Sequence, residues 1–96
     1  MIESLLLEIE DTIKLYEKIA NYPATRTRQM IERKGVIKAL SDLVISGEIQ
    51  KGFKLLAEKN KLDKSFESVI LRYDTLFDPE IVNSAKWRLD NYDKLF

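Results

Sequence analysis

The spacing of the apolar residues constrains the fold of this chain most. Between residues 2 and 20 they recur at steps of three and four, which places them on one face of an α-helix. This stripe consists of Ile2, Leu5, Leu6, Ile9, Ile13, Tyr16 and Ala20. Shorter stripes with the same steps follow, and no stretch alternates apolar and polar residues as a half-buried strand would. We therefore expect an all-α fold, a compact orthogonal bundle of five or six helices.

Proline, glycine and small polar residues divide the chain into these helices. The first helix should end before Tyr22-Pro23, because a proline ring cannot continue the helical hydrogen bonds. Thr25 or Thr27 then caps a short helix that Gly35 ends, and residues 36–45 form the next one. Ser46-Gly47 terminates that helix.

The second half of the chain carries three further helices. The helical period continues with Ile49, Phe53, Leu56 and Ala57. It ends at Asn60, which can adopt a left-handed turn. Asp63 or Ser65 caps a short helix, and Asp78-Pro79-Glu80 is a strong start signal for the last one. The last helix should point Ile81, Val82, Ala85, Leu89 and Tyr92 inward.

Length and composition indicate one folded domain. The chain has 96 residues, of which 45% are hydrophobic and 33% charged, too apolar for disorder and too charged for a membrane protein. We expect one domain over residues 1–96, a leading helix at 1–21 and a helical module at 24–94. Apolar runs are short and the start lacks the pattern of a signal peptide, so we expect a cytoplasmic location and no membrane partner.

The residue types exclude most catalytic chemistry. The chain contains no His and no Cys, which removes a His general base, a Ser-His or Cys-His pair and a conventional zinc site. Acid pairs at helical spacing, Glu8 with Asp11 and Asp90 with Asp93, fall on predicted solvent faces. We expect no catalytic residue, no metal and no cofactor, and we interpret the protein as a non-enzyme.

Positive charge is concentrated in the middle of the chain. The net charges of residues 1–24, 25–64 and 65–96 are −3, +5 and −2. The candidate contacts to an anion such as a nucleic-acid phosphate are Thr25, Arg26, Thr27, Arg28, Arg33, Lys34 and Lys38. The alternative is that Thr25 caps its helix and the arginines pair with acids of the first or last helix. A DNA-reading helix-turn-helix is disfavoured, because residues 36–45 offer few polar side chains to a groove.

Three large apolar residues fall outside the predicted core stripes. On a helical wheel Leu7 and Leu15 lie on the charged face of the first helix, and Trp87 lies away from the inward face of the last. Exposed groups of this kind often anchor a protein interface. The alternative is that a neighbouring segment covers them, since a helix in a small bundle can be contacted on two sides.

A set of motifs over residues 24–91 resembles a small helical module of uncharacterised bacterial proteins, found alone or at the end of longer chains. The motifs are the run Ala24 to Arg33 with Gly35, Gly52 to Leu56, Leu62 to Glu67, Leu76-Phe77, Ala85 and Arg88-Leu89. The resemblance implies a setting in mobile elements or defence, and it implies no activity. Gly35 and Gly52 should mark a backbone bend or a close helix approach. The leading helix lies outside the resemblance.

Two functions remain open from the sequence. The first is a helical module that binds another protein or a second copy of itself, as a homodimer, through Leu7, Leu15 and Trp87. The second is an accessory protein that contacts nucleic acid through the arginine and lysine residues of the basic segment.

Overall fold

The computed structural model describes residues 2–45 and 51–94, and in these ranges it contains six α-helices, three short 3-10 helices and no strand. The α-helices are α1 (Ile2–Ala20), α2 (Thr25–Lys34), α3 (Val36–Ile45), α4 (Lys51–Glu58), α5 (Phe66–Arg72) and α6 (Pro79–Asp90). The 3-10 helices are η1 (Leu62–Lys64), η2 (Asp74–Leu76) and η3 (Tyr92–Lys94). The predicted all-α bundle is confirmed.

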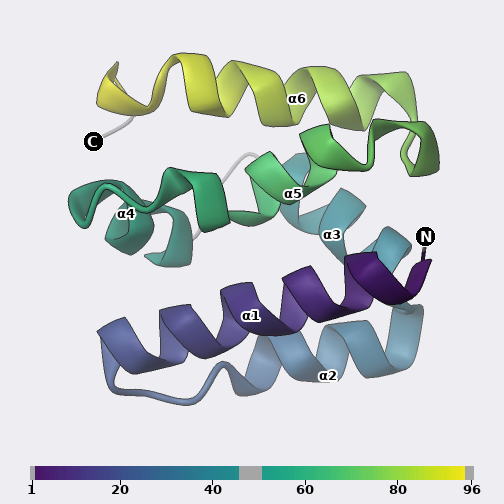
Figure 1. Ribbon diagram of the computed structural model, residues 1–96. Helices are drawn as coiled ribbons and strands as arrows, with labels where there is room; N and C mark the ends of the chain where they lie inside the picture. The colour runs from purple at the N-terminus through teal and green to yellow at the C-terminus, as the bar shows by residue number, and fades with distance from the viewer. Residues whose placement is uncertain (1, 46–50, 95–96) are drawn as a thin grey trace.

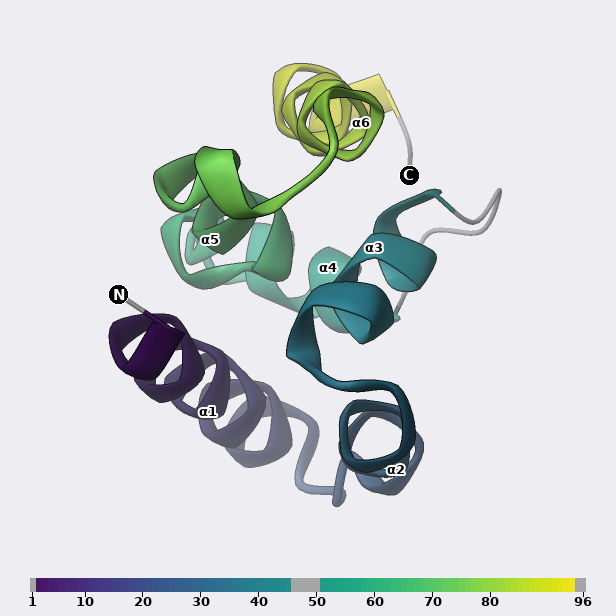
Figure 2. The same cartoon turned by 90° about the vertical axis from the view of Figure 1, so that its right-hand side faces the viewer.

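Helix α5 lies between α1 and α6 (Figure 1). It packs against α6 on one side and against α1 on the other, while α3 contacts α6 and α4 contacts α1. Figures 1 and 2 show α2 beside α1, at the side of the bundle away from α6. The extents of the described part are 29 × 27 × 22 Å.

Several predicted helix ends are confirmed in their geometry. Gly35 has a φ of 83°, and its N–H donates to the carbonyl of Ile31. Asn60 adopts the left-handed region with a φ of 57°. The Ser65 hydroxyl accepts a hydrogen bond from the N–H of Ser68 at the start of α5. The predictions for Ser46-Gly47 and Ile49 fall outside the described residues.

The prediction that Thr25 or Thr27 caps α2 is wrong. Helix α2 begins at Thr25, its N-cap residue is Ala24, and no side chain of the cap residue bonds to the helix. A carboxylate from α1 takes that role instead, because Glu17 accepts a 2.7 Å hydrogen bond from the N–H of Ala24. The capping group therefore comes from tertiary structure rather than from the local sequence.

The core is built from one face of each packed helix. Its buried apolar residues in the core cluster are Leu5, Ile9, Ile13, Ala24, Val36, Leu40, Val44, Val69, Ile70, Phe77, Ile81 and Ala85. The predicted stripe of α1 is too wide, since Ile2 and Leu6 are each 47% exposed. Leu6 lines an open groove between α1 and α2. Helix α2 therefore covers that side of α1 only in part.

Two further positions differ from the expected inward faces. Thr12 is buried, and its hydroxyl donates a 2.5 Å hydrogen bond to the carbonyl of Lys64. Tyr92, expected to point inward, is exposed. The reason is that α6 ends at Asp90 and a 3-10 helix follows, so the helical period used for the prediction no longer applies.

Gly52 marks a close approach of two helices, as the sequence predicted. A Cβ atom placed on Gly52 would lie 3.1 Å from Cδ1 of the Tyr16 ring. The absence of a side chain therefore lets the start of α4 lie directly against α1.

Candidate functional site

Arg28 of the basic segment is held by two carboxylates of α1. Its Nη1 lies 2.9 Å from both carboxylate oxygens of Glu10, while Nε and Nη2 contact Glu17 at 3.2 and 2.8 Å. The hydrogen bonds from Arg28 and from the N–H of Ala24 lower the pKa of Glu17 to about 2. For Arg28 the structure thus agrees with the alternative prediction, an ion pair with acids of the first helix.

Two other cations of the basic segment are paired as well. Lys34 and Lys38 both contact the carboxylate of Asp42 in α3, each at 3.0 Å. These contacts lower the pKa of Asp42, with the hydrogen bond from Lys34 as the largest cause. Arg26 and Arg33 are exposed, and in the described part of the chain no carboxylate pairs with them.

The two threonines of the basic segment have different surroundings. Thr25 is exposed, whereas Thr27 lines an internal cavity. The seven predicted anion contacts therefore do not form one cluster of available donors.

The three apolar residues proposed as interface anchors differ in exposure. Leu7 is 69% exposed and Trp87 is 56% exposed, while Leu15 is half-buried. The half-buried position of Leu15 agrees better with the alternative that a neighbouring segment covers it. Leu7 lies on α1 and Trp87 on α6, and α5 separates these helices in Figures 1 and 2. Leu7 and Trp87 therefore belong to two separate surfaces.

Acidic side chains flank Leu7 along α1. Glu3, Leu7 and Asp11 form one row at four-residue steps, so they are neighbours on the same side of the helix. Both carboxylates are exposed, and no cation contacts either of them among the described residues. An exposed leucine between two available carboxylates is the most distinct chemical pattern on this surface.

A buried ion pair joins α5 to α6, and the sequence did not predict it. Nη1 of Arg88 lies 3.1 Å from Oε2 of Glu67, and these residues are 4% and 3% exposed. Burial raises the pKa of the Glu67 carboxyl above its usual value, because the charged form loses its hydration. The sequence does contain one indication that Arg88 is buried. Arg88 follows Ile81 and Ala85 at helical steps of four and three, which places it on the inward face of α6.

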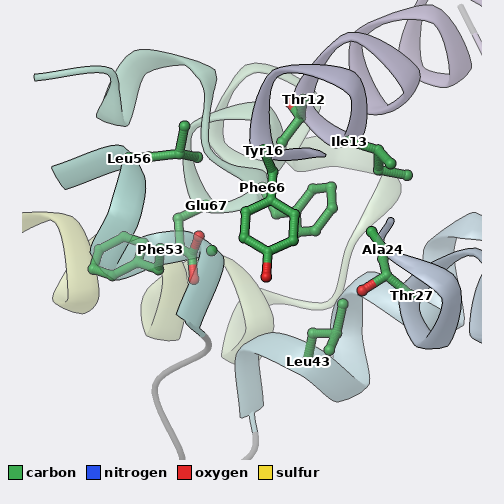
Figure 3. Close-up of a pocket in the computed structure, with 11 residues that line it drawn as sticks. Thr12, Ile13, Tyr16, Ala24, Thr27, Leu43, Phe53, Leu56, Phe66 and Glu67 are labelled. Atoms are coloured by element: carbon green, nitrogen blue, oxygen red, sulfur yellow. The ribbon is translucent and has the colours of Figure 1, made fainter. Parts of the chain in front are cut away.

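A cavity of about 120 Å³ lies where the first five helices meet. Its lining comprises Thr12, Ile13, Tyr16, Ala24, Thr27, Leu43, Gly52, Phe53, Leu56, Phe66 and Glu67. Figure 3 shows Tyr16 at the centre, with Phe53 and Glu67 on one side and Ala24 and Thr27 on the other. The Thr12 hydroxyl and the Glu67 carboxylate already have protein partners. The cavity is therefore mainly apolar, with few polar groups available to a guest.

Glu8, from one of the acid pairs noted in the sequence, makes contacts within the chain. Glu8 accepts hydrogen bonds from the Tyr73 hydroxyl and from Nε of Arg72. These contacts, the one from Tyr73 first, lower the pKa of Glu8. Across residues 2–45 and 51–94, no three acidic side chains come close enough together to hold a metal ion.

None of the helices in the described ranges combines the length and the apolar character needed to cross a membrane. The chain matches no family model, and neither a curated protein nor a solved structure shows significant similarity to it.

Proposed function

We propose that this protein is a non-enzymatic binding module that holds another protein through the outer face of α1. The observation that carries the proposal is Leu7, a leucine that is 69% exposed and lies between the carboxylates of Glu3 and Asp11. The partner that fits this face presents an apolar pocket with lysine or arginine residues at its rim.

The charge of the α1 surface favours a foreign partner over a second copy. Residues 2–13 contain four acids and no base, and two of the acids, Glu8 and Glu10, already bind Arg72 and Arg28. A contact of Leu7 with Leu7 of another copy would bring Glu3 and Asp11 of both copies together. Like charges at such short range oppose association.

The structure supports a nucleic-acid contact less well. Such a contact depends on lysine and arginine residues that can reach phosphates. Arg28, Lys34 and Lys38 contact carboxylates of this chain, which leaves Arg26 and Arg33 of the five predicted cations. Two exposed arginines on one short helix would contribute little electrostatic free energy to the binding of nucleic acid.

The test compares two variants of α1 as bait for partner proteins. Leu7→Gln removes the apolar group, and Lys14→Gln changes an exposed residue of the same helix without removing one. We expect the partner protein to bind the wild type and Lys14→Gln equally and to bind Leu7→Gln at least about tenfold more weakly. Added salt should release the partner. Quantitative mass spectrometry of the captured proteins measures this difference.

Light scattering of the purified chain separates the remaining outcomes. We expect a monomer for the wild type and for both variants. A stable dimer that Leu7→Gln dissociates would assign this face to self-association instead. Partners captured equally by wild type and Leu7→Gln, or no partner at all, would contradict the proposed interface.

A further inference from the structure

We infer that the cavity between α1, α2, α3, α4 and α5 binds a small neutral aromatic molecule that carries one hydroxyl group, such as a phenol. The cavity volume is about 120 Å³. An apolar cavity of about 150 Å³ in another protein stays dry and binds benzene, so the volume here suits a single six-membered ring.

The walls of the cavity match an aromatic guest. Three of them are aromatic rings, those of Tyr16, Phe53 and Phe66, and the aliphatic side chains of Ile13 and Leu56 close the remaining sides. Aromatic rings attract one another in offset and edge-to-face arrangements. Apolar pockets with a few placed polar groups are typical of sites for small molecules.

Two hydroxyl groups of the lining are available to orient the guest. Tyr16 and Thr27 both contribute to the lining, and neither hydroxyl has a hydrogen-bond partner within residues 2–45 and 51–94. A hydroxyl both donates and accepts, so either one can bond to a phenolic OH. Thr27 lies across the cavity from Glu67 in Figure 3.

The charges around the cavity favour a neutral guest. Glu67 belongs to the lining, and its carboxylate contacts Nη1 of Arg88 at 3.1 Å. An ammonium guest would compete with Arg88 for this carboxylate, and a carboxylate guest would be repelled by it. Since an unpaired charge in an apolar space is costly, a ring with a hydroxyl group is the better match.

The residues that line the cavity differ in exposure. Tyr16, Thr27, Leu43 and Phe66 are half-buried, whereas Ile13, Phe53 and Leu56 are buried. The two available hydroxyls therefore belong to partly exposed residues of the lining, and its buried residues named here are apolar. This site shares no residue with the Leu7 face of α1, so it is independent of the proposed protein contact.

The test titrates the full chain with phenol and with benzene, observed by amide chemical shifts in NMR spectra. We expect saturable shifts at the lining residues and a dissociation constant for phenol on the order of 1 mM. Thr27→Val should weaken phenol binding by about fivefold to tenfold and leave benzene binding unchanged, because it removes a hydroxyl and keeps the size. Anilinium and benzoate should bind more weakly than phenol.

A cavity-filling variant provides the second measurement. Ala24→Leu should abolish the shifts for both ligands while circular dichroism remains that of the wild type. If Ala24→Leu fails to fold, the Thr27→Val comparison decides. Absence of saturable shifts with either ligand, or shifts away from the lining, would overturn the inference. Phenol binding that neither Thr27→Val nor Tyr16→Phe weakens would overturn it as well.

Discussion

Glu67 and Arg88 are the residues at which charge and burial conflict most. Both lie within the packed faces of α5 and α6, where the other buried residues are Val69, Ile70, Ile81 and Ala85. Bringing two ions out of water is costly, and the pair is tolerated because each side chain has a hydrogen-bond partner. The pair fixes which side of α6 faces α5, since any rotation of α6 would leave both charges buried and unpaired.

The buried pair gives a prediction on stability. Arg88→Met should lower the free energy of unfolding by about 3–5 kcal/mol, because it leaves the Glu67 carboxylate buried without its cation. The double variant Glu67→Leu with Arg88→Met should regain most of that loss. Urea unfolding of the wild type, both single variants and the double variant measures the coupling. Additive effects of the two substitutions would contradict this account.

At the scale of elements, α2 is a ten-residue helix without a buried side chain. No residue between Thr25 and Lys34 is buried, although Ile31 packs at the edge of the core. The contacts of Arg28 with Glu10 and Glu17 therefore take a large share in holding α2 against α1. Elements with few buried apolar contacts open locally before the rest of a protein unfolds.

Arg28→Ala should consequently loosen one helix rather than the whole fold. We expect amide hydrogen exchange in residues 25–34 to accelerate on the order of tenfold, with little change in α5 and α6. Arg26→Ala is the matched control, since Arg26 is exposed on the same helix and no carboxylate pairs with it in the described ranges. Equal exchange in the two variants would show that Ile31 and the adjoining turns hold α2 without Arg28.

The helices were predictable from the sequence because their signals are local. Apolar spacing, Pro23, Gly35, Asn60 and Pro79 predicted the segments that the structure contains. The contacts between helices were less predictable. Glu17 is eight residues away from Thr25 in the sequence, yet it provides the acceptor at the start of α2 that Thr25 was expected to provide.

The candidate site was predictable only in part, for the same reason. A helical wheel shows that Leu7 and Trp87 lie outside the core stripe, and both are exposed. It places Leu15 outside the stripe too, although Leu15 is half-buried in the structure. It also treats charged residues as solvent-facing, which is why Glu67 and Arg88 were missed. The cavity requires five helices in place, so no stretch of sequence reveals it.

For the molecule as a whole, two carboxyls make stability depend on pH in opposite directions. The pKa of Glu17 falls to about 2 in the folded state from its usual 4.5. Its stabilising contribution is thus present above pH 4.5 and lost as the pH falls toward 2. The pKa of Glu67 is raised by burial, so its contribution is complete below pH 4.5 and is lost as the pH rises through the raised pKa.

Thermal unfolding across pH separates the two carboxyls. Glu17→Gln should flatten the decline of the midpoint temperature below pH 4.5, because the glutamine has no proton to gain there. Glu67→Gln should instead flatten the profile above pH 4.5. Glu3→Gln removes a carboxyl at an exposed position without a cation partner in the described residues and serves as the control. A Glu17→Gln profile parallel to the wild type would contradict the assignment.

The separation of Leu7 from Trp87 bears on how many chains the molecule could bind at one time. Leu7 and Trp87 are exposed on helices that α5 keeps apart, within a body no longer than 29 Å, so a chain bound at one of them would not occupy the other. Chains bound at both positions would be tethered to one short body. This would raise the local concentration of each chain near the other without any additional contact between them.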